Sequence, residues 1–85
     1  MTYHVYILRC ADSTLYTGVA KNLSLRLDQH NTSRLGAKYT RGRRPVTLLY
    51  SEQHPDRSSA QIAEARIKKL SHSQKLSYTH QLGNK

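Results

Sequence analysis

The sequence is poor in acidic residues, in cysteine and in long apolar segments. Five Asp and Glu stand against fourteen Lys and Arg, which gives a formal net charge of +9. A fold does not need such an excess, which favours a polyanionic partner, nucleic acid first and a membrane surface second. No segment is long or apolar enough to span a bilayer, and the N-terminus has no charged region ahead of a long apolar stretch. We therefore expect a soluble, intracellular protein.

The single cysteine, Cys10, excludes an internal disulfide. It lies in an apolar strand pattern, so we interpret it as a small core residue rather than a nucleophile. The five histidines lack Cys or His partners at zinc-finger spacing, so a zinc site is not expected. Eighty-five residues suit one domain, residues 1–85, whose core is near the lower size limit for folding without disulfides or metals.

The pattern of apolar, polar and turn-forming residues predicts the order strand, strand, helix, strand, helix, helix. The predicted strands are Tyr3–Cys10, Leu15–Ala20 and Val46–Ser51. Between the second and third strands we expect a helix, capped by Asn22 or Ser24 and ending near Asn31. The polar, glycine-containing residues 32–45 then predict a loop.

The C-terminal third of the chain predicts two helices. The first begins at Asp56, Ser58 or Ser59, and its apolar stripe consists of Ala60, Ala63, Ile67 and Leu70. Ser73 is expected to cap the last helix, which carries Leu76 and Leu82. Because these stripes have only the sheet to cover, we expect an α+β fold, a small three-stranded antiparallel sheet flanked by helices.

Two tyrosines in the predicted hairpin are candidate site residues. A three-residue turn at residues 11–13 would place Tyr6 opposite Gly18 and Leu8 opposite Tyr16, so that both phenols share one face. Gly18 would then leave space above Tyr6 for a phosphate. A two-residue turn would separate the phenols. The alternative is that both are ordinary strand residues, because Tyr is favoured in strands.

Three further side chains have functional groups suited to phosphodiester cleavage. Arg26 can hold a phosphate oxygen, and His30, one helical turn later, can orient or deprotonate a water or a tyrosine. Glu64, surrounded by cations, can bind a hard cation such as Mg²⁺. The alternatives are a solvated helix face for Arg26, a helix-end cation for His30, and a surface ion pair of Glu64 with Lys68.

A third set of candidate residues combines cations with an aromatic ring, as nucleic-acid-binding surfaces do. The alternative is a solvated run of charges. The candidates in the predicted loop and in the helix of Glu64 are Lys38, Tyr39, Thr40, Arg41, Arg43, Arg44, Lys68 and Lys69.

The tripeptides His4-Val5-Tyr6 and Tyr16-Thr17-Gly18 resemble the two strand motifs that name the GIY-YIG nuclease superfamily. The whole chain resembles its small branch of standalone single-domain bacterial proteins, of the YhbQ/YazA type. Further matches in the same order are Arg26, His30, Glu64 and residues 36–43. The resemblance implies a GIY-YIG-like fold and an in-line attack of water on a phosphodiester, assisted by one Mg²⁺ or Mn²⁺ ion.

The resemblance also implies roles for residues. Tyr6 matches the tyrosine assigned as general base, and Tyr16 the tyrosine that helps to hold the water or phosphate. Arg26 and His30 match the helix arginine and its neighbouring histidine or tyrosine, and Glu64 matches the metal ligand. A tyrosine pKa near 10 is too high for a base at neutral pH, so Arg26 and Mg²⁺ are expected to lower it. Larger relatives carry a further asparagine, for which Asn84 is a weak match.

These implications predict a metal-dependent endodeoxyribonuclease of low sequence specificity that acts on single-stranded or irregular DNA, in DNA processing or repair. We expect it in the bacterial cytoplasm, associated with the nucleoid, as a monomer or weak dimer. A non-catalytic nucleic-acid-binding module of the same fold is the first alternative. A protein-interaction domain with incidental charge is the second. Salt-insensitive binding would favour the second, because phosphate contacts weaken steeply as salt rises.

Overall fold

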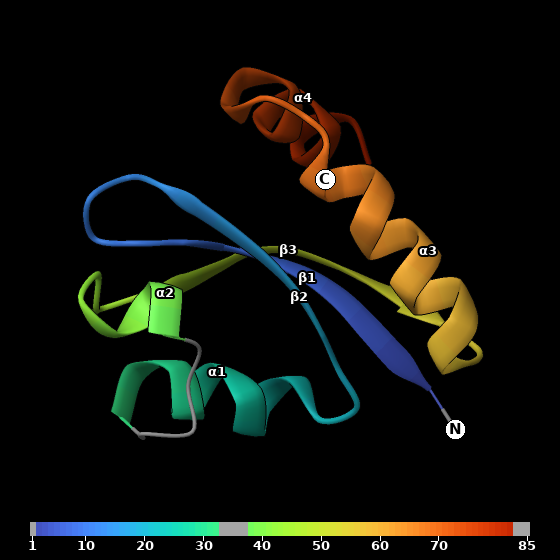
Figure 1. Ribbon diagram of the computed structural model, residues 1–85, viewed down its shortest axis with the longest axis horizontal. Coiled ribbons are helices and arrows are strands. Elements are labelled where there is room, and N and C mark those ends of the chain that lie inside the picture. The colour runs from blue at the N-terminus through green and yellow to red at the C-terminus, as the bar shows by residue number, and fades with distance from the viewer. Residues whose placement is uncertain (1, 33–37, 83–85) are drawn as a thin grey trace.

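A computed structural model describes residues 2–32 and 38–82 of the chain (Figure 1). Its elements in chain order are β1 (Tyr3–Arg9), β2 (Leu15–Ala20), α1 (Leu23–Thr32), α2 (Lys38–Arg41), β3 (Thr47–His54), α3 (Arg57–Lys68) and α4 (His72–Leu82). The strands form one antiparallel sheet in the order β2-β1-β3. The expected α+β class, with a three-stranded antiparallel sheet flanked by helices, is confirmed.

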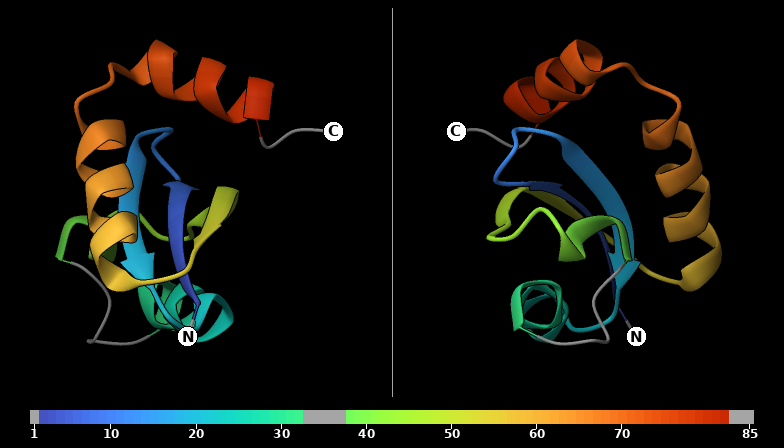
Figure 2. Two further views of the ribbon diagram at one scale, coloured as in Figure 1. Left: turned by 90° about the vertical axis from the view of Figure 1, so that its right-hand side faces the viewer. Right: turned by 60° about the vertical axis from the view of Figure 1, so that its left-hand side comes forward.

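The central strand β1 is buried on both faces because helices cover the two sides of the sheet (Figure 2). Val5 and Ile7 point to one face, where they cluster with Ile67 of α3. The alternate residues Tyr6 and Leu8 point to the other face, which α1 covers. Period-two alternation in β1 thus divides the core into two clusters. Cys10, 3% exposed, belongs to the α1 side, as expected of a core residue.

Hydrogen bonds at the starts of α1 and α3 show which of the candidate residues caps each helix. Asn22 Oδ1 accepts from the backbone N–H of Leu25 at 3.0 Å, and Asp56 Oδ1 accepts from that of Ser59 at 2.8 Å. Both caps satisfy amide donors that lack a partner within the first helical turn. Asn22 and Asp56 therefore begin α1 and α3, as two of the expected alternatives.

Several boundaries differ from the prediction, and the smallest difference is that β1 ends at Arg9 rather than Cys10. The helix α4 begins after Ser71 rather than Ser73, because Ser71 and Gln74 exchange hydrogen bonds as a capping box. Strand β3 starts one residue later than expected and continues to His54 instead of ending at Ser51. Residues 32–45, predicted as a loop, contain the short helix α2. The side chain of Leu82, the segment 33–37 and Asn84 lie outside the described residues.

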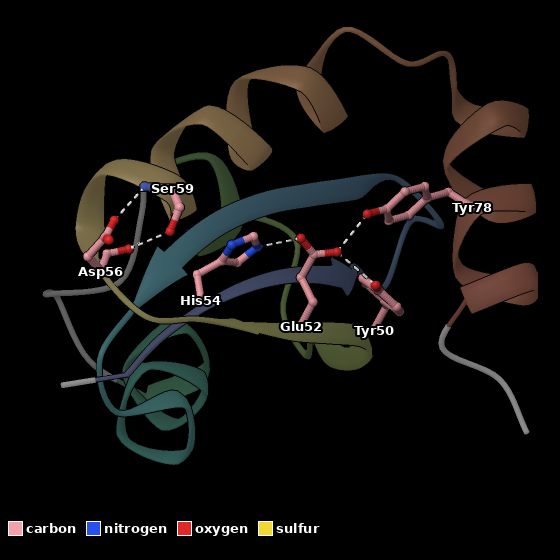
Figure 3. A network of polar contacts seen from close by, with 6 residues as sticks. All are labelled: Tyr50, Glu52, His54, Asp56, Ser59 and Tyr78. Carbon is pink, nitrogen blue, oxygen red and sulfur yellow. Dashed lines mark hydrogen bonds and ion pairs between the residues drawn. The ribbon is translucent and has the colours of Figure 1, made fainter.

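A carboxylate on β3 joins this strand to α4 (Figure 3). Glu52 accepts hydrogen bonds from the hydroxyls of Tyr50 at 2.8 Å and Tyr78 at 2.6 Å, and from Nε2 of His54 at 2.6 Å. Burial alone would raise the pKa of Glu52, but these hydrogen bonds outweigh it and the pKa lies below its usual value. The network links β3 to α4 on the face opposite α1.

None of the described helices is both long and apolar enough to cross a membrane.

Candidate active site

The β1–β2 hairpin places the two motif tyrosines on one face. Cys10 N–H donates to the Thr14 carbonyl at 2.8 Å, which closes a three-residue turn at residues 11–13. Within this turn Ser13 has a φ of 69°, the left-handed conformation that short hairpin loops need at one position. The register therefore pairs Tyr6 with Gly18, as expected from this turn length. The rings of Tyr6 and Tyr16 lie 6.4 Å apart between centroids.

Position 18 has room only for glycine because the hydroxyl of Tyr6 packs against it. A Cβ at this position would lie 2.5 Å from the Tyr6 hydroxyl oxygen and 3.1 Å from Cε2 of Tyr16. The space above Tyr6 was expected to admit a phosphate, but the phenol itself fills it, and Tyr6 is only 1% exposed. Gly18 thus lets the phenol pack against the backbone of β2.

We expect Gly18→Ala to lower the free energy of unfolding by about 1–3 kcal/mol, because the added methyl group must displace the buried phenol. Gly42→Ala is the matched control, since a Cβ at Gly42 meets nothing within 4 Å. That control should change stability by less than about 0.5 kcal/mol. Chemical denaturation followed by circular dichroism measures both variants. Equal stability of the two would contradict the close contact.

His30 links Tyr6 to the short helix α2. Its Nε2 lies 2.9 Å from the Tyr6 hydroxyl, and its Nδ1 lies 2.9 Å from the hydroxyl of Thr40. His30 and Thr40 are fully buried. Thr40 was expected to contact nucleic acid, but burial prevents that contact, and its hydroxyl instead fixes the His30 ring. The sequence did not reveal this role because α2 was expected to be loop.

Burial keeps both members of the Tyr6–His30 pair neutral near pH 7. It lowers the pKa of His30 to about 4, with the cations Arg26 and Arg44 acting in the same direction. This excludes the alternative of a helix-end cation. Burial raises the pKa of Tyr6 to about 12, although a hydrogen bond with Arg26 opposes the change. Arg26 thus lowers the pKa of Tyr6 as expected, but desolvation is the larger effect, so this pKa remains above its usual value.

The two arginines near His30 occupy different positions. Arg26 is half-buried, and its Nη1 donates to the side chain of Gln29 at 3.0 Å. Its guanidinium also lies close enough to Tyr6 to lower the pKa of that phenol. Arg44 instead donates to the backbone carbonyls of Gln29 and His30 at the end of α1. Arg44, expected to bind nucleic acid, thus caps α1 carbonyls that lack helical partners.

An exposed aromatic and cationic surface adjoins the buried pair. The Tyr16 ring lies 5.2 Å from that of His30 and 5.7 Å from that of Tyr39, which is 39% exposed. The guanidinium of Arg43 lies 4.1 Å from the Tyr39 centroid and forms an ion pair with Asp12 at 2.9 Å. Of the other residues expected to bind nucleic acid, Lys38 and Arg41 of α2 are exposed near Tyr39. Lys68 and Lys69, at the end of α3, are exposed as well.

Glu64 projects from α3, on the other side of the sheet from α1. Its carboxylate forms an ion pair with Lys68 at 3.1 Å, so the alternative surface pair exists. The negative charge of Glu64 also raises the pKa of Tyr6. This contribution is smaller than those of burial and of the nearby Tyr16. The four proposed groups of Tyr6, His30, Arg26 and Glu64 thus interact electrostatically, though they come from three elements.

A hard divalent ion fits this donor set only if the substrate completes its coordination. Among residues 2–32 and 38–82, no three His, Cys, Asp or Glu side chains cluster as metal ligands. Mg²⁺ is usually bound by one or two carboxylates, with waters and substrate phosphates supplying its other oxygens. The single carboxylate of Glu64, 23% exposed, meets that requirement.

Comparison with known proteins identifies the family of this chain. Residues 2–77 match the family described as the GIY-YIG catalytic domain. The UPF0213 protein DP2720 of Desulfotalea psychrophila is 52% identical over 73 residues, 86% of this chain and 66% of that one. A UPF0213 protein of Streptococcus sanguinis is 48% identical over 75 residues, 88% of this chain and 85% of its own length.

Solved structures agree with these relatives. The solution NMR structure of EF2693 from E. faecalis superposes with a TM-score of 0.69 at 36% identity, covering 100% of this chain and 90% of that one. The family match spans the hairpin with both tyrosines, α1 with Arg26 and His30, and α3 with Glu64. The chain belongs to the GIY-YIG family, a nuclease superfamily, and is related to its small UPF0213 proteins.

Proposed function

We propose that this protein is a divalent-metal-dependent endodeoxyribonuclease that hydrolyses phosphodiester bonds with little sequence specificity. The observation that carries the proposal is the buried hydrogen bond between Tyr6 and His30, 2.9 Å long, whose two members interact with Arg26. A buried phenol and imidazole, both neutral, do not need each other for charge compensation. They form a pair through which a proton can move.

The hydrogen-bonded pair allows Tyr6 to act as a base despite its high pKa. Tyr6 is 1% exposed, so a small opening must first admit the attacking water to its hydroxyl. As that water attacks the phosphorus in line, the Tyr6 oxygen accepts a proton from it while its own proton passes to Nε2 of His30. No free phenolate is then formed. This transfer requires neutral His30 with its Nδ1–H donated to Thr40, an arrangement that the 2.9 Å contact permits. The low pKa of His30 keeps the acceptor nitrogen free of a proton.

The remaining residues bind and orient the phosphate. Arg26 donates to a non-bridging oxygen and offsets the negative charge that grows in the transition state. Tyr16, half-buried beside His30, orients the water or the phosphate. Glu64 would hold one Mg²⁺ or Mn²⁺ ion, which supplies positive charge to the phosphate and the leaving oxygen.

The substrate is single-stranded or irregular DNA, gripped by the exposed cations and by Tyr39. An exposed ring suits an unpaired base, because stacking on a π-face requires a base outside the duplex. Such a specificity fits DNA processing or repair at the nucleoid of a bacterial cytoplasm, by a monomer or weak dimer.

Cleavage of end-labelled oligonucleotides tests the proposal. Single-stranded, flapped and duplex DNA are incubated at low salt with Mg²⁺, with Mn²⁺ or with chelator. Cutting is expected only with a metal, and faster on single-stranded and flapped DNA than on duplex. Absence of cutting under every condition, with DNA binding that weakens as salt rises, would support the non-catalytic binding module instead.

A further inference from the structure

A pocket lies away from Tyr6 and Tyr16, where α3 begins beside the sheet. Its volume is about 360 Å³. Two cations approach the ring of Tyr3 in it: Lys21 Nζ lies 5.7 Å and Arg57 Cζ 5.8 Å from the ring centroid. Tyr3 is half-buried, while Lys21 and Arg57 are exposed. The lining residues are Tyr3, Val19, Ala20, Lys21, Arg57 and Gln61.

The chemistry of this pocket matches one nucleotide. Tyr3 is half-buried and lines the pocket, so its ring can contact a base, and Gln61 offers both a donor and an acceptor to a base edge. Lys21 and Arg57 offer positive charge to the adjacent phosphates. We propose that the Tyr3 pocket binds one nucleotide of the nucleic-acid strand whose scissile phosphate lies at Tyr6 and Glu64, an inference that rests on the proposed function.

The helix α3 connects the pocket to the site. Arg57, Gln61 and Glu64 are spaced i, i+4 and i+7, so they lie along one face of the helix. At 1.5 Å per residue, Arg57 precedes Glu64 by about 10.5 Å along the axis. This separation corresponds to about three nucleotides at the 3.4 Å rise of a B-form strand, and to fewer in an extended strand. A strand following this face therefore places a flanking nucleotide in the pocket.

The stacking contact is tested with Tyr3→Leu and its control Tyr3→Phe, which keeps the ring. Binding is measured by fluorescence anisotropy in chelator, so that cleavage plays no part. The probes are a thymidine strand and an abasic strand, both of about ten nucleotides. Tyr3→Leu should weaken binding of the thymidine strand about tenfold, the size of one lost base stack, and leave the abasic strand unchanged. Tyr3→Phe should bind both strands like the wild type.

The phosphate contact is tested with Arg57→Gln and the control Lys75→Gln, which removes the same charge from α4. The slope of log affinity against log salt concentration should decrease by about 0.7 for Arg57→Gln, the value for one phosphate contact of a single strand. Lys75→Gln should keep the wild-type slope. Equal slopes for the two variants would overturn the phosphate contact.

Equal losses of Tyr3→Leu on the thymidine and abasic strands, or no loss on either, would overturn the stacking contact. These outcomes are separable from failure of the nuclease. A wild type that cuts DNA while Tyr3→Leu binds normally refutes the pocket and leaves the proposed function intact. A wild type that never cuts but shows ring-dependent binding refutes the nuclease and retains the pocket as a nucleotide site. RNA strands of the same length decide which sugar the pocket accepts.

Discussion

Glu64→Gln is expected to reduce metal-dependent cleavage by at least about a thousandfold, equivalent to about 4 kcal/mol of transition-state stabilisation. Glutamine keeps the length of the side chain but replaces an anionic ligand with a neutral amide, which a hard divalent ion binds poorly. The effect should be large because no group of three or more potential metal ligands occurs in the described part of the chain to bind the ion in its place. Initial rates on single-stranded DNA at saturating Mg²⁺ measure it.

Asp28→Asn is the matched control, because it removes the same charge from an exposed position on α1. It should leave the rate within about twofold, as expected for a surface change. Glu64→Gln should still bind DNA in chelator at least as tightly as the wild type, because a negative charge beside the phosphate is lost. Cleavage by Glu64→Gln at the wild-type rate would reduce Glu64 to a surface partner of Lys68.

Tyr6→Phe should slow cleavage by about a hundredfold to ten-thousandfold, the range for loss of a positioned general base. The phenyl ring keeps the packing against Gly18 but cannot relay a proton. Because the pKa values of the pair are about 12 for Tyr6 and about 4 for His30, neither group titrates near neutrality. We expect no inflection from this pair between about pH 6 and pH 9, and a decline only as acid protonates His30.

Tyr50→Phe separates chemistry from stability. It also removes a buried tyrosine hydroxyl, but on the opposite face of the sheet, where the partner is Glu52. Both substitutions remove one side-chain hydrogen bond from the protein interior and should cost about 0.5–3 kcal/mol of stability. Only Tyr6→Phe should slow cleavage of the remaining folded protein. Equal rates in the two variants, measured well below their unfolding temperatures, would exclude Tyr6 from proton transfer.

The hairpin and its chemistry were accessible from the sequence because they depend on local rules. A three-residue turn and two-residue alternation are sufficient to place Tyr6 opposite Gly18. Helical spacing likewise predicts that Arg26 and His30 share a face of α1. The fold class followed from the order of these patterns, since apolar stripes on helices require a sheet to cover.

What the sequence did not reveal depends on contacts between distant segments. Helix α2 is only four residues long, in a polar and basic segment, and its buried Thr40 forms a hydrogen bond with His30 of another helix. The raised pKa of Tyr6 depends on how completely the surrounding core removes water, which no spacing rule gives. Glu52 gave no signal either, because its partners include Tyr78, twenty-six residues away.

Tyr6 has a second property besides its hydroxyl: it is part of the hydrophobic core. It packs in one buried cluster with Leu8, Cys10 and Val46, on the strand that occupies the centre of the sheet. The proposed reaction centre is thus rigid for the same reason that the domain is folded. Stability and catalysis are therefore coupled at this position, in evolution as in protein engineering. A core substitution beside Tyr6 changes the catalytic geometry together with the folding free energy.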